Sequence, residues 1–157
     1  MSLRIAIDFD GTLVAQDHPH DDLDTPLTFI PGAKEALASF KAAGHYLILW
    51  SGRSNLSLRK DWRLNPRNVF AHSAGKFSLE RWEKNQILNE ARYQQMLDFV
   101  QRELLGYFDE IDDGCQGKIS ADLYIDDRVL TLGGELGYTW PELQDILGEK
   151  DATPQDL

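Results

Sequence analysis

Three short apolar runs without polar alternation lie at residues 3–8, 46–50 and 121–125 of the chain. Their sequences are LRIAID, YLILW and ADLYI. An unbroken apolar run of this length is typical of a strand that is covered on both faces, as in a parallel sheet between helices. The pattern therefore predicts three buried strands, and the first and third lead into aspartates.

Helical spacing of apolar residues fills the stretches between these strands. We expect one helix within residues 31–44, a long helix from residue 79 or 85 to 105, and a final helix at residues 140–147. The first and last begin with a proline, which is favoured in the first helical turn. A short strand is expected within residues 107–111.

Two internal stretches show no sustained periodicity. Residues 11–29 are polar and rich in aspartate and histidine, which predicts a loop or a small hairpin. Residues 55–83 begin with helical spacing that gives way to the turn-like LNPRN and to HSAGKF, which we interpret as an irregular insertion. Residues 149–157 are expected to be a frayed tail.

Alternation of strands and helices predicts an α/β fold, with a three-layer, doubly wound and mostly parallel sheet of the Rossmann-like kind. The 157 residues fit one domain, because a chain of this length can form a single core. With 42% hydrophobic and 27% charged residues, the composition is that of an ordinary globular protein and argues against disorder.

Charge is distributed unevenly along the chain. The net charge is −10, which argues against a general affinity for nucleic acid or for anionic membranes. Residues 51–84 nevertheless carry eight basic side chains against three acidic ones, a net +5, so the remainder carries −15. We call this stretch the basic segment; whether it covers a site or binds substrate stays open.

The only cysteine, Cys115, cannot form an internal disulfide, which fits a reducing compartment. No apolar run approaches the roughly 20 residues that a membrane-spanning helix needs. We also find no room for a signal peptide before the charged residues near Asp8. These features predict a cytoplasmic protein.

Polar residues that can support chemistry follow three of the predicted strands. In an open parallel sheet the functional crevice lies at the carboxyl ends of the strands, so these groups can meet in one pocket. A fourth candidate, Lys118, precedes the last strand. The three groups are Asp8-Phe9-Asp10-Gly11-Thr12, Ser51-Gly52-Arg53 and Asp126-Asp127-Arg128.

Carboxylates gathered in one pocket need positive charge nearby. Two of them about 4 Å apart repel by roughly 4 kcal/mol at an effective dielectric of 20. A hard divalent cation with oxygen ligands relieves this repulsion, and Mg²⁺ is the usual ion where carboxylates and a substrate phosphate share it. Lys118 would add a second positive charge. Such a pocket suits a phosphoryl group.

The four groups also match a known pattern. DFDGT (8–12), LWSGR (49–53), a following lysine and YIDD (124–127) strongly resemble the haloacid dehalogenase superfamily of phosphatases. The motifs occur in the same order as in that family, each at a predicted strand end or its approach, from residue 4 to about 147. The resemblance implies a Mg²⁺-dependent phosphatase of the corresponding fold.

Roles for the aspartates follow from this resemblance. Asp8 would be the nucleophile that becomes an aspartyl phosphate. Asp10 would protonate the leaving alcohol and later deprotonate water, which requires partial desolvation and a raised pKa. Asp8, the backbone carbonyl of Asp10, and Asp126 would bind the metal. Asp127 would be a further metal ligand or would contact and orient the residues that bind the metal.

The remaining motif residues would contact the phosphate. The resemblance implies that Ser51 forms a hydrogen bond with a phosphate oxygen, that Gly52 also binds the phosphate, and that Lys118 pairs with both the phosphate and Asp8. Arg53 is our candidate for a second anionic contact, because a guanidinium fork binds two phosphate oxygens. Simpler alternatives are a helix-capping role for Ser51 and a surface charge for Lys118.

Neither gap between motifs has room for a full cap domain, so the chain resembles the cap-poor branch of the family, in which a large substrate or a neighbouring subunit closes the site. A homodimer is therefore plausible, and the phosphorylated substrate is either small or macromolecular. Two other functions stay open: a receiver-like domain that holds a phosphoaspartate, and a catalytically idle binding module. The order of the motifs argues against the first, and the intact motifs argue against the second.

Overall fold

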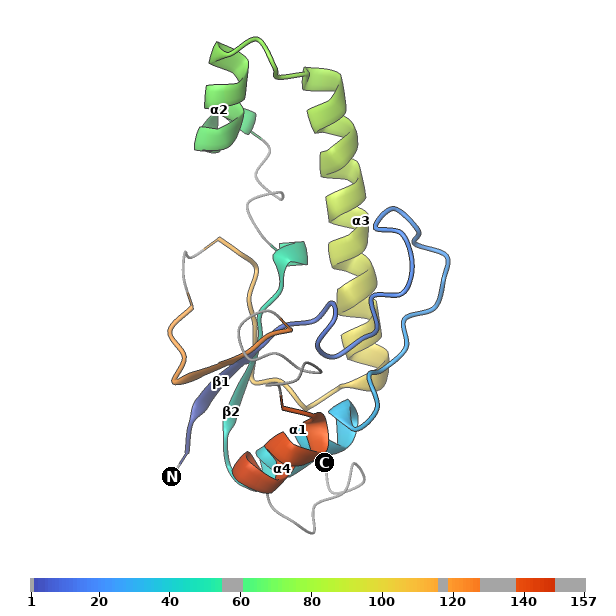
Figure 1. The fold of residues 1–157 in the computed structure, drawn as a ribbon, viewed down its shortest axis with the longest axis vertical. Helices are drawn as coiled ribbons and strands as arrows, with labels where there is room; N and C mark the ends of the chain where they lie inside the picture. Colours follow the sequence, from blue (N-terminus) through green and yellow to red (C-terminus); the bar gives the residue numbers. More distant parts are fainter. Residues whose placement is uncertain (1, 55–60, 116–118, 128–137, 149–157) are drawn as a thin grey trace.

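The computed structural model describes residues 2–54, 61–115, 119–127 and 138–148 (Figure 1). Lys118 and the expected tail at 149–157 lie outside these residues. Two short 3₁₀ helices, η1 (Gly52–Ser54) and η3 (Trp62–Leu64), accompany the main elements. These main elements are β1 (Arg4–Ile7), α1 (Ala33–Ala42), β2 (Tyr46–Leu49), α2 (Pro66–Ser73), α3 (Leu79–Glu103), β3 (Glu110–Ile111), β4 (Leu123–Ile125) and α4 (Trp140–Leu147).

Four strands form a parallel sheet in the order β3-β2-β1-β4. In the register of the sheet, Ile7 at the end of β1 lies opposite Leu49 of β2 and Ile125 of β4. The predicted α/β class and the three strands are thus confirmed, although β4 buries only Ile125 while β1 and β2 each bury three residues. The strand expected within residues 107–111 is reduced to the two residues of β3. Among the described residues, none of the helices combines the length and the apolar character needed to cross a membrane.

The core lies where the sheet meets α1, α4 and the C-terminal part of α3. Met96, Phe99 and Val100 are the buried residues of α3. The ring of Phe99 packs edge-on against Phe9, with centroids 5.7 Å apart. Full burial of a large apolar side chain contributes about 1.5–3 kcal/mol. This packing therefore holds the residue between Asp8 and Asp10 against the long helix.

Helix α4 supports the same loop from the other direction. Trp140, which is 2% exposed, donates from Nε1 to the backbone carbonyl of Thr12 at 2.9 Å. Its ring also lies 6.3 Å from that of Phe40 in α1. A capping box between Thr139 and Glu142 begins the helix. The chain segment after Asp8 is thus held between two helices.

One expectation from the sequence is wrong: residues 55–83 are not irregular throughout. Helix α2 occupies Pro66–Ser73, and the side chain of Asn65 caps it by accepting from the backbone N–H of Arg67. The residues that we interpreted as a turn are a helix start, because proline is as favourable at the first helical position as in a turn. Helix α3 begins at the earlier of the two expected positions, behind the N-cap Ser78.

The arm, which we define as η3, α2 and the N-terminal half of α3, extends away from the sheet in Figure 1. Its aromatic side chains pack on one another. The ring of Trp62 lies 4.9 Å from that of His72 and 4.4 Å from that of Phe77. Helix α2 buries none of its residues. The arm is therefore held by its own aromatic cluster and by the continuous helix α3.

Candidate active site

Three carboxylates converge where β1 and β4 end. The backbone N–H of Asp8 donates to the carbonyl of Ile125 at 2.9 Å, which continues the pairing of the two strands. Asp8 therefore lies beside the residues that follow β4. One carboxylate oxygen from each of Asp8, Asp126 and Asp127 lies within 4.8 Å of the others. We call these three residues the acidic triad.

The turn after Asp8 positions the last member of the triad. The backbone N–H of Asp127 donates to Oγ1 of Thr12 at 3.1 Å. Gly11 has φ +77°, and a Cβ at that position would lie 3.0 Å from Oδ2 of Asp127. A glycine is favoured here for two reasons, since its backbone is left-handed and the carboxylate passes close by. The Gly11-Thr12 pair thus forms the support against which Asp127 rests.

Asp8 is the member of the triad with a strongly shifted pKa. Burial raises the pKa of the Asp8 carboxyl from 3.8 to about 7, and the neighbouring charges of Asp126, Asp10 and Asp127 add to the rise. A backbone hydrogen bond from Phe9 opposes it. The pocket therefore disfavours three negative charges together, which is the electrostatic condition under which a cation binds well.

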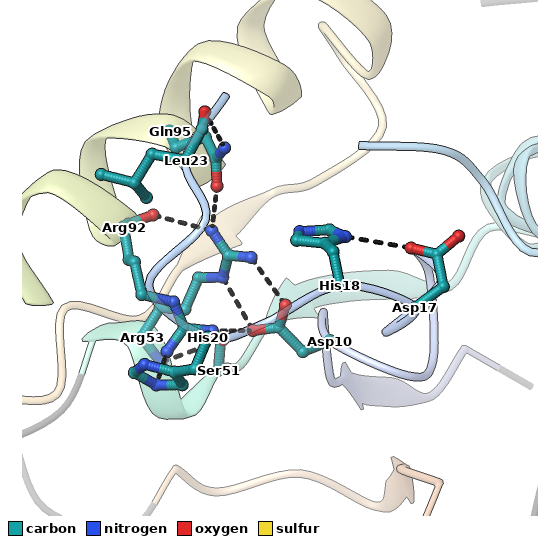
Figure 2. Close-up of polar contacts among 9 residues, drawn as sticks. All are labelled: Asp10, Asp17, His18, His20, Leu23, Ser51, Arg53, Arg92 and Gln95. Carbon is teal, nitrogen blue, oxygen red and sulfur yellow. Dashed lines mark hydrogen bonds and ion pairs between the residues drawn. The ribbon is translucent and has the colours of Figure 1, made fainter. Parts of the chain in front are cut away.

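The side chain of Asp10 pairs with Arg53 (Figure 2). Nε and Nη2 of Arg53 donate to the two oxygens of Asp10, each at 2.7 Å. The Arg53 side chain is 3% exposed and that of Asp10 is 17% exposed. Such a two-pronged, charge-assisted pair is strong and directional. Among the described residues, the Asp10 carboxylate is not one of the groups that converge in the acidic triad.

Arg53 is placed differently from our expectation that it contacts phosphate. Its Nη1 donates to the carbonyl of Arg92 at 3.0 Å and to Oε1 of Gln95 at 2.8 Å. With the two bonds to Asp10, four donor contacts of a group with five N–H bonds end on protein acceptors. No complete fork is left for a phosphate in this arrangement, so the observed role of Arg53 is to hold Asp10.

Three further residues of the site escaped the sequence analysis: Arg92 and Gln95 of α3, and His20. Nη2 of Arg92 lies 3.4 Å from Oδ2 of Asp10, and its Nη1 makes a short contact with Nε2 of His20. Gln95 donates to the carbonyl of Leu23 at 3.0 Å, which ties the loop at residues 11–29 to the helix. Nothing in the local sequence marks these side chains as part of a site.

Ser51 and Gly52 follow β2, and of the two only Gly52 is among the residues that line the cavity shared with the triad. Ser51 is 5% exposed, and its Oγ accepts from the backbone N–H of Arg53 at 3.2 Å. This contact corresponds to the capping role that we gave as the simpler alternative. The predicted role of Lys118 concerns a residue outside the described part of the chain.

A cavity of about 410 Å³ connects these groups. Its volume is that of a site for a small ligand. The acidic triad forms one part of the wall and the cluster around Arg53 another. The lining residues are Asp8, Asp10, Gln16, His20, Trp50, Gly52, Arg53, Arg92, Asp126 and Asp127.

The donor set of the triad fits a hard divalent cation, because its three converging side chains all offer carboxylate oxygens. All three members of the triad also line the cavity. The chain matches no protein-family model, no curated protein and no solved structure in three separate comparisons. Function must therefore be argued from the site alone.

Proposed function

We propose that the chain is a Mg²⁺-dependent phosphomonoester hydrolase that acts through an aspartyl phosphate on Asp8. The observation that carries the proposal is the convergence of Asp8, Asp126 and Asp127 within 4.8 Å in the lining of one cavity. A carboxylate that shares a cation with its substrate is well placed to attack phosphorus. The haloacid dehalogenase-like motifs and the expected three-layer arrangement belong to the same proposal.

In the proposed reaction, a carboxylate oxygen of Asp8 forms a bond to phosphorus while the bond from phosphorus to the ester oxygen breaks. The leaving oxygen takes a proton from Asp10 and departs as an alcohol. Water then gives a proton to Asp10 and attacks the phosphorus, which releases inorganic phosphate and restores Asp8. Magnesium, held by Asp8, Asp126 and Asp127, would supply charge neutralisation for the phosphoryl oxygens.

The pairing with Arg53 bears directly on the role of Asp10. Both oxygens of Asp10 accept N–H groups of Arg53. Because a guanidinium offers only donors, an Asp10 that carries a proton must give up at least one of these bonds. We therefore propose that Arg53 holds the carboxylate form of Asp10 beside the cavity, and that one of the two bonds breaks when Asp10 acts as the acid.

Hydrolysis of an aryl phosphate by the purified protein tests the proposal. Phosphate release should require Mg²⁺, stop on chelation, and fall by at least about a thousandfold in Asp8→Asn, because loss of a nucleophile removes the covalent path. Asp98→Asn is a matched control, since Asp98 is an exposed residue of α3 whose carboxylate accepts from Gln94. Equal rates for Asp8→Asn and the wild type would exclude the covalent mechanism.

The lifetime of the phosphoenzyme separates hydrolysis from the receiver-like alternative. A hydrolase should turn the aspartyl phosphate over within seconds, whereas a phosphoacceptor should keep it for minutes. Rapid-quench labelling with a radioactive phosphodonor measures this lifetime.

The single cysteine is the basis on which we also propose a cytoplasmic location.

A further inference from the structure

The cavity that the acidic triad lines also contains a cluster with an excess positive charge. Arg53 and Arg92 contribute two guanidinium charges, and Asp10, which lies between them, contributes one negative charge. The net charge of this cluster is therefore +1. It is held close to the protein interior, because the side chains of Arg53 and Arg92 are only 3% and 11% exposed. A charge of this kind is less screened than one on the open surface.

His20 does not cancel or add to this charge near neutral pH. Burial and the neighbouring Arg92 lower the pKa of His20 below its ordinary value of 6.5. The neutral ring accepts from Nη1 of Arg92 through Nε2. Its role in the cluster is to orient the Arg92 side chain at the cavity wall.

Arg92 has the donor capacity that Arg53 lacks. Among the described residues, the side-chain partners of Arg92 are Nε2 of His20 and Oδ2 of Asp10. A guanidinium has five N–H bonds, so these two contacts leave donors available. Burial and the nearby charge of Arg53 also lower the pKa of Arg92, which means that the cluster disfavours its own second cation. An anion that enters the cavity would offset the repulsion between the two guanidinium charges.

We propose that Arg92, oriented by His20, binds a second anionic group of the substrate while the phosphoryl group lies at the acidic triad. The lining of the cavity then offers two kinds of group, three carboxylates that suit a metal-bound phosphate and a guanidinium whose charge is not balanced. The substrate class is a small phosphomonoester that carries a carboxylate or a second phosphate a few bonds from the ester. This inference rests on the proposed function for the phosphoryl end alone.

A second cavity of about 220 Å³ shares the same cluster but is a poorer place for this anion. It is lined by Asp22 as well as by Asp10, and it does not include any member of the acidic triad. An anion there would meet a further carboxylate and would lie outside the cavity that holds Asp8. The larger cavity is the one that contains both kinds of charged group.

Two non-hydrolysable probes test the proposal without any turnover. Phosphonoacetate and ethylphosphonate share a phosphonate and differ in whether the neighbouring carbon carries a carboxylate or a methyl group. Calorimetric titration in excess Mg²⁺ should show that the wild-type protein binds phosphonoacetate at least about tenfold more tightly, a typical gain for a charge-assisted contact. In Arg92→Gln the ratio of the two affinities should fall to about one or two.

Arg102→Gln is the matched control, because Arg102 lies on the same helix, pairs with Glu103 and is 64% exposed. It should keep the wild-type ratio. Equal wild-type affinities for the two probes, no binding of either probe, or an unchanged ratio in Arg92→Gln would each overturn the proposal. The wild-type ratio needs no variant, so the test stands even if Arg92→Gln does not fold.

The two proposals fail in different ways. If phosphonoacetate is preferred and Arg92→Gln removes the preference, but no phosphomonoester is hydrolysed, then the anion site is correct and the hydrolase assignment is wrong. If aryl phosphate is hydrolysed through Asp8 while the two phosphonates bind alike, the hydrolase assignment is supported and the second anion site is wrong.

Discussion

The carboxylate of Asp10 and the guanidinium of Arg53 face each other through two hydrogen bonds of 2.7 Å. The residues are 43 positions apart in the chain, and each belongs to a motif at the carboxyl end of a strand, Asp10 after β1 and Arg53 after the neighbouring β2. A contact that the sequence assigned to substrate is thus used inside the protein. This pair of hydrogen bonds connects Asp10, which is proposed to act first as the acid and then as the base, to the residues that follow β2.

The variant Arg53→Lys distinguishes two roles of Arg53, the positioning of Asp10 and a direct contact with phosphate, because they affect kcat and KM differently. Lysine keeps the charge but offers no planar fork, so Asp10 should lose its fixed orientation. We expect kcat on an aryl phosphate to fall by about 10–100-fold with little change in KM, within the range that a positioned general acid contributes. Steady-state kinetics of Arg53→Lys, Asp10→Asn and the double variant measure this.

The double variant supplies the control. If Arg53 acts through Asp10, adding Arg53→Lys to Asp10→Asn should cost little further activity, because coupled residues are non-additive. A rise in KM with kcat unchanged would instead support the direct phosphate contact that the sequence suggested for Arg53.

Asp8→Asn should stabilise the metal-free protein in a way that depends on pH. The pKa of Asp8 is about 7 in the folded protein against an ordinary 3.8. The folded state therefore keeps a proton that the unfolded chain has lost, and stability decreases as pH rises from about 4 to 7. At pH 8 the variant should gain on the order of 4 kcal/mol over the wild type, and at pH 5 about half of that or less.

Urea denaturation in the presence of a chelator measures this gain. Asp98→Asn, at an exposed position, should show no comparable dependence on pH. A variant Asp8→Asn that is less stable than the wild type at pH 8 would mean that Asp8 is not destabilised by its surroundings.

The acidic triad was predictable because its position depends only on local signals. Asp8 and Asp126 each follow a buried apolar run directly, and parallel strands bring their carboxyl ends to one edge of the sheet. No knowledge of helix docking was needed. The same reasoning located Ser51 after β2.

Arg92 and His20 could not be predicted in this way. Their contact joins residues 72 positions apart, and it depends on how α3 packs on the sheet and on how the loop at residues 11–29 folds back to it. Neither the packing of α3 on the sheet nor the path of this loop produces a periodic pattern in the sequence. Helix α2 was missed for a different reason, since Asn65-Pro66 is compatible with both a turn and a helix start.

Magnesium should stabilise the protein, and more strongly at high pH. A ligand present at a hundred times its Kd adds about 2.7 kcal/mol to the free energy of unfolding. Because Asp8 has a pKa of about 7, binding at pH 6 must displace a proton, so the affinity should be several-fold higher at pH 8. Calorimetry in two buffers of different ionisation enthalpy measures the proton released.

The variants Asp126→Asn and Asp127→Asn should weaken Mg²⁺ binding by at least about tenfold, since each removes a charged ligand from a site with few others. Asp98→Asn should bind as the wild type does. Equal affinity at pH 6 and pH 8 in the wild type would contradict the participation of Asp8 in the metal site.

Gly11 and Gly44 provide a matched pair that isolates the close approach to Asp127. Both have left-handed backbones, with φ +77° and +80°, so alanine should destabilise the protein by about 1 kcal/mol at either position. At Gly44 a Cβ meets nothing within 4 Å, whereas at Gly11 it lies 3.0 Å from Oδ2 of Asp127. Only Gly11→Ala should therefore displace a member of the acidic triad.

The expected result is that Gly11→Ala loses at least about fivefold in Mg²⁺ affinity, because a metal ligand that moves by a few tenths of an ångström no longer matches a near-ideal octahedron. Gly44→Ala should keep the wild-type affinity while showing a similar loss of thermal stability. Titration with Mg²⁺ and thermal unfolding of both variants give the two quantities separately. If the two variants bind Mg²⁺ equally well, the turn after Asp8 does not position the metal site, and the support that Gly11 and Thr12 give to Asp127 is structural only.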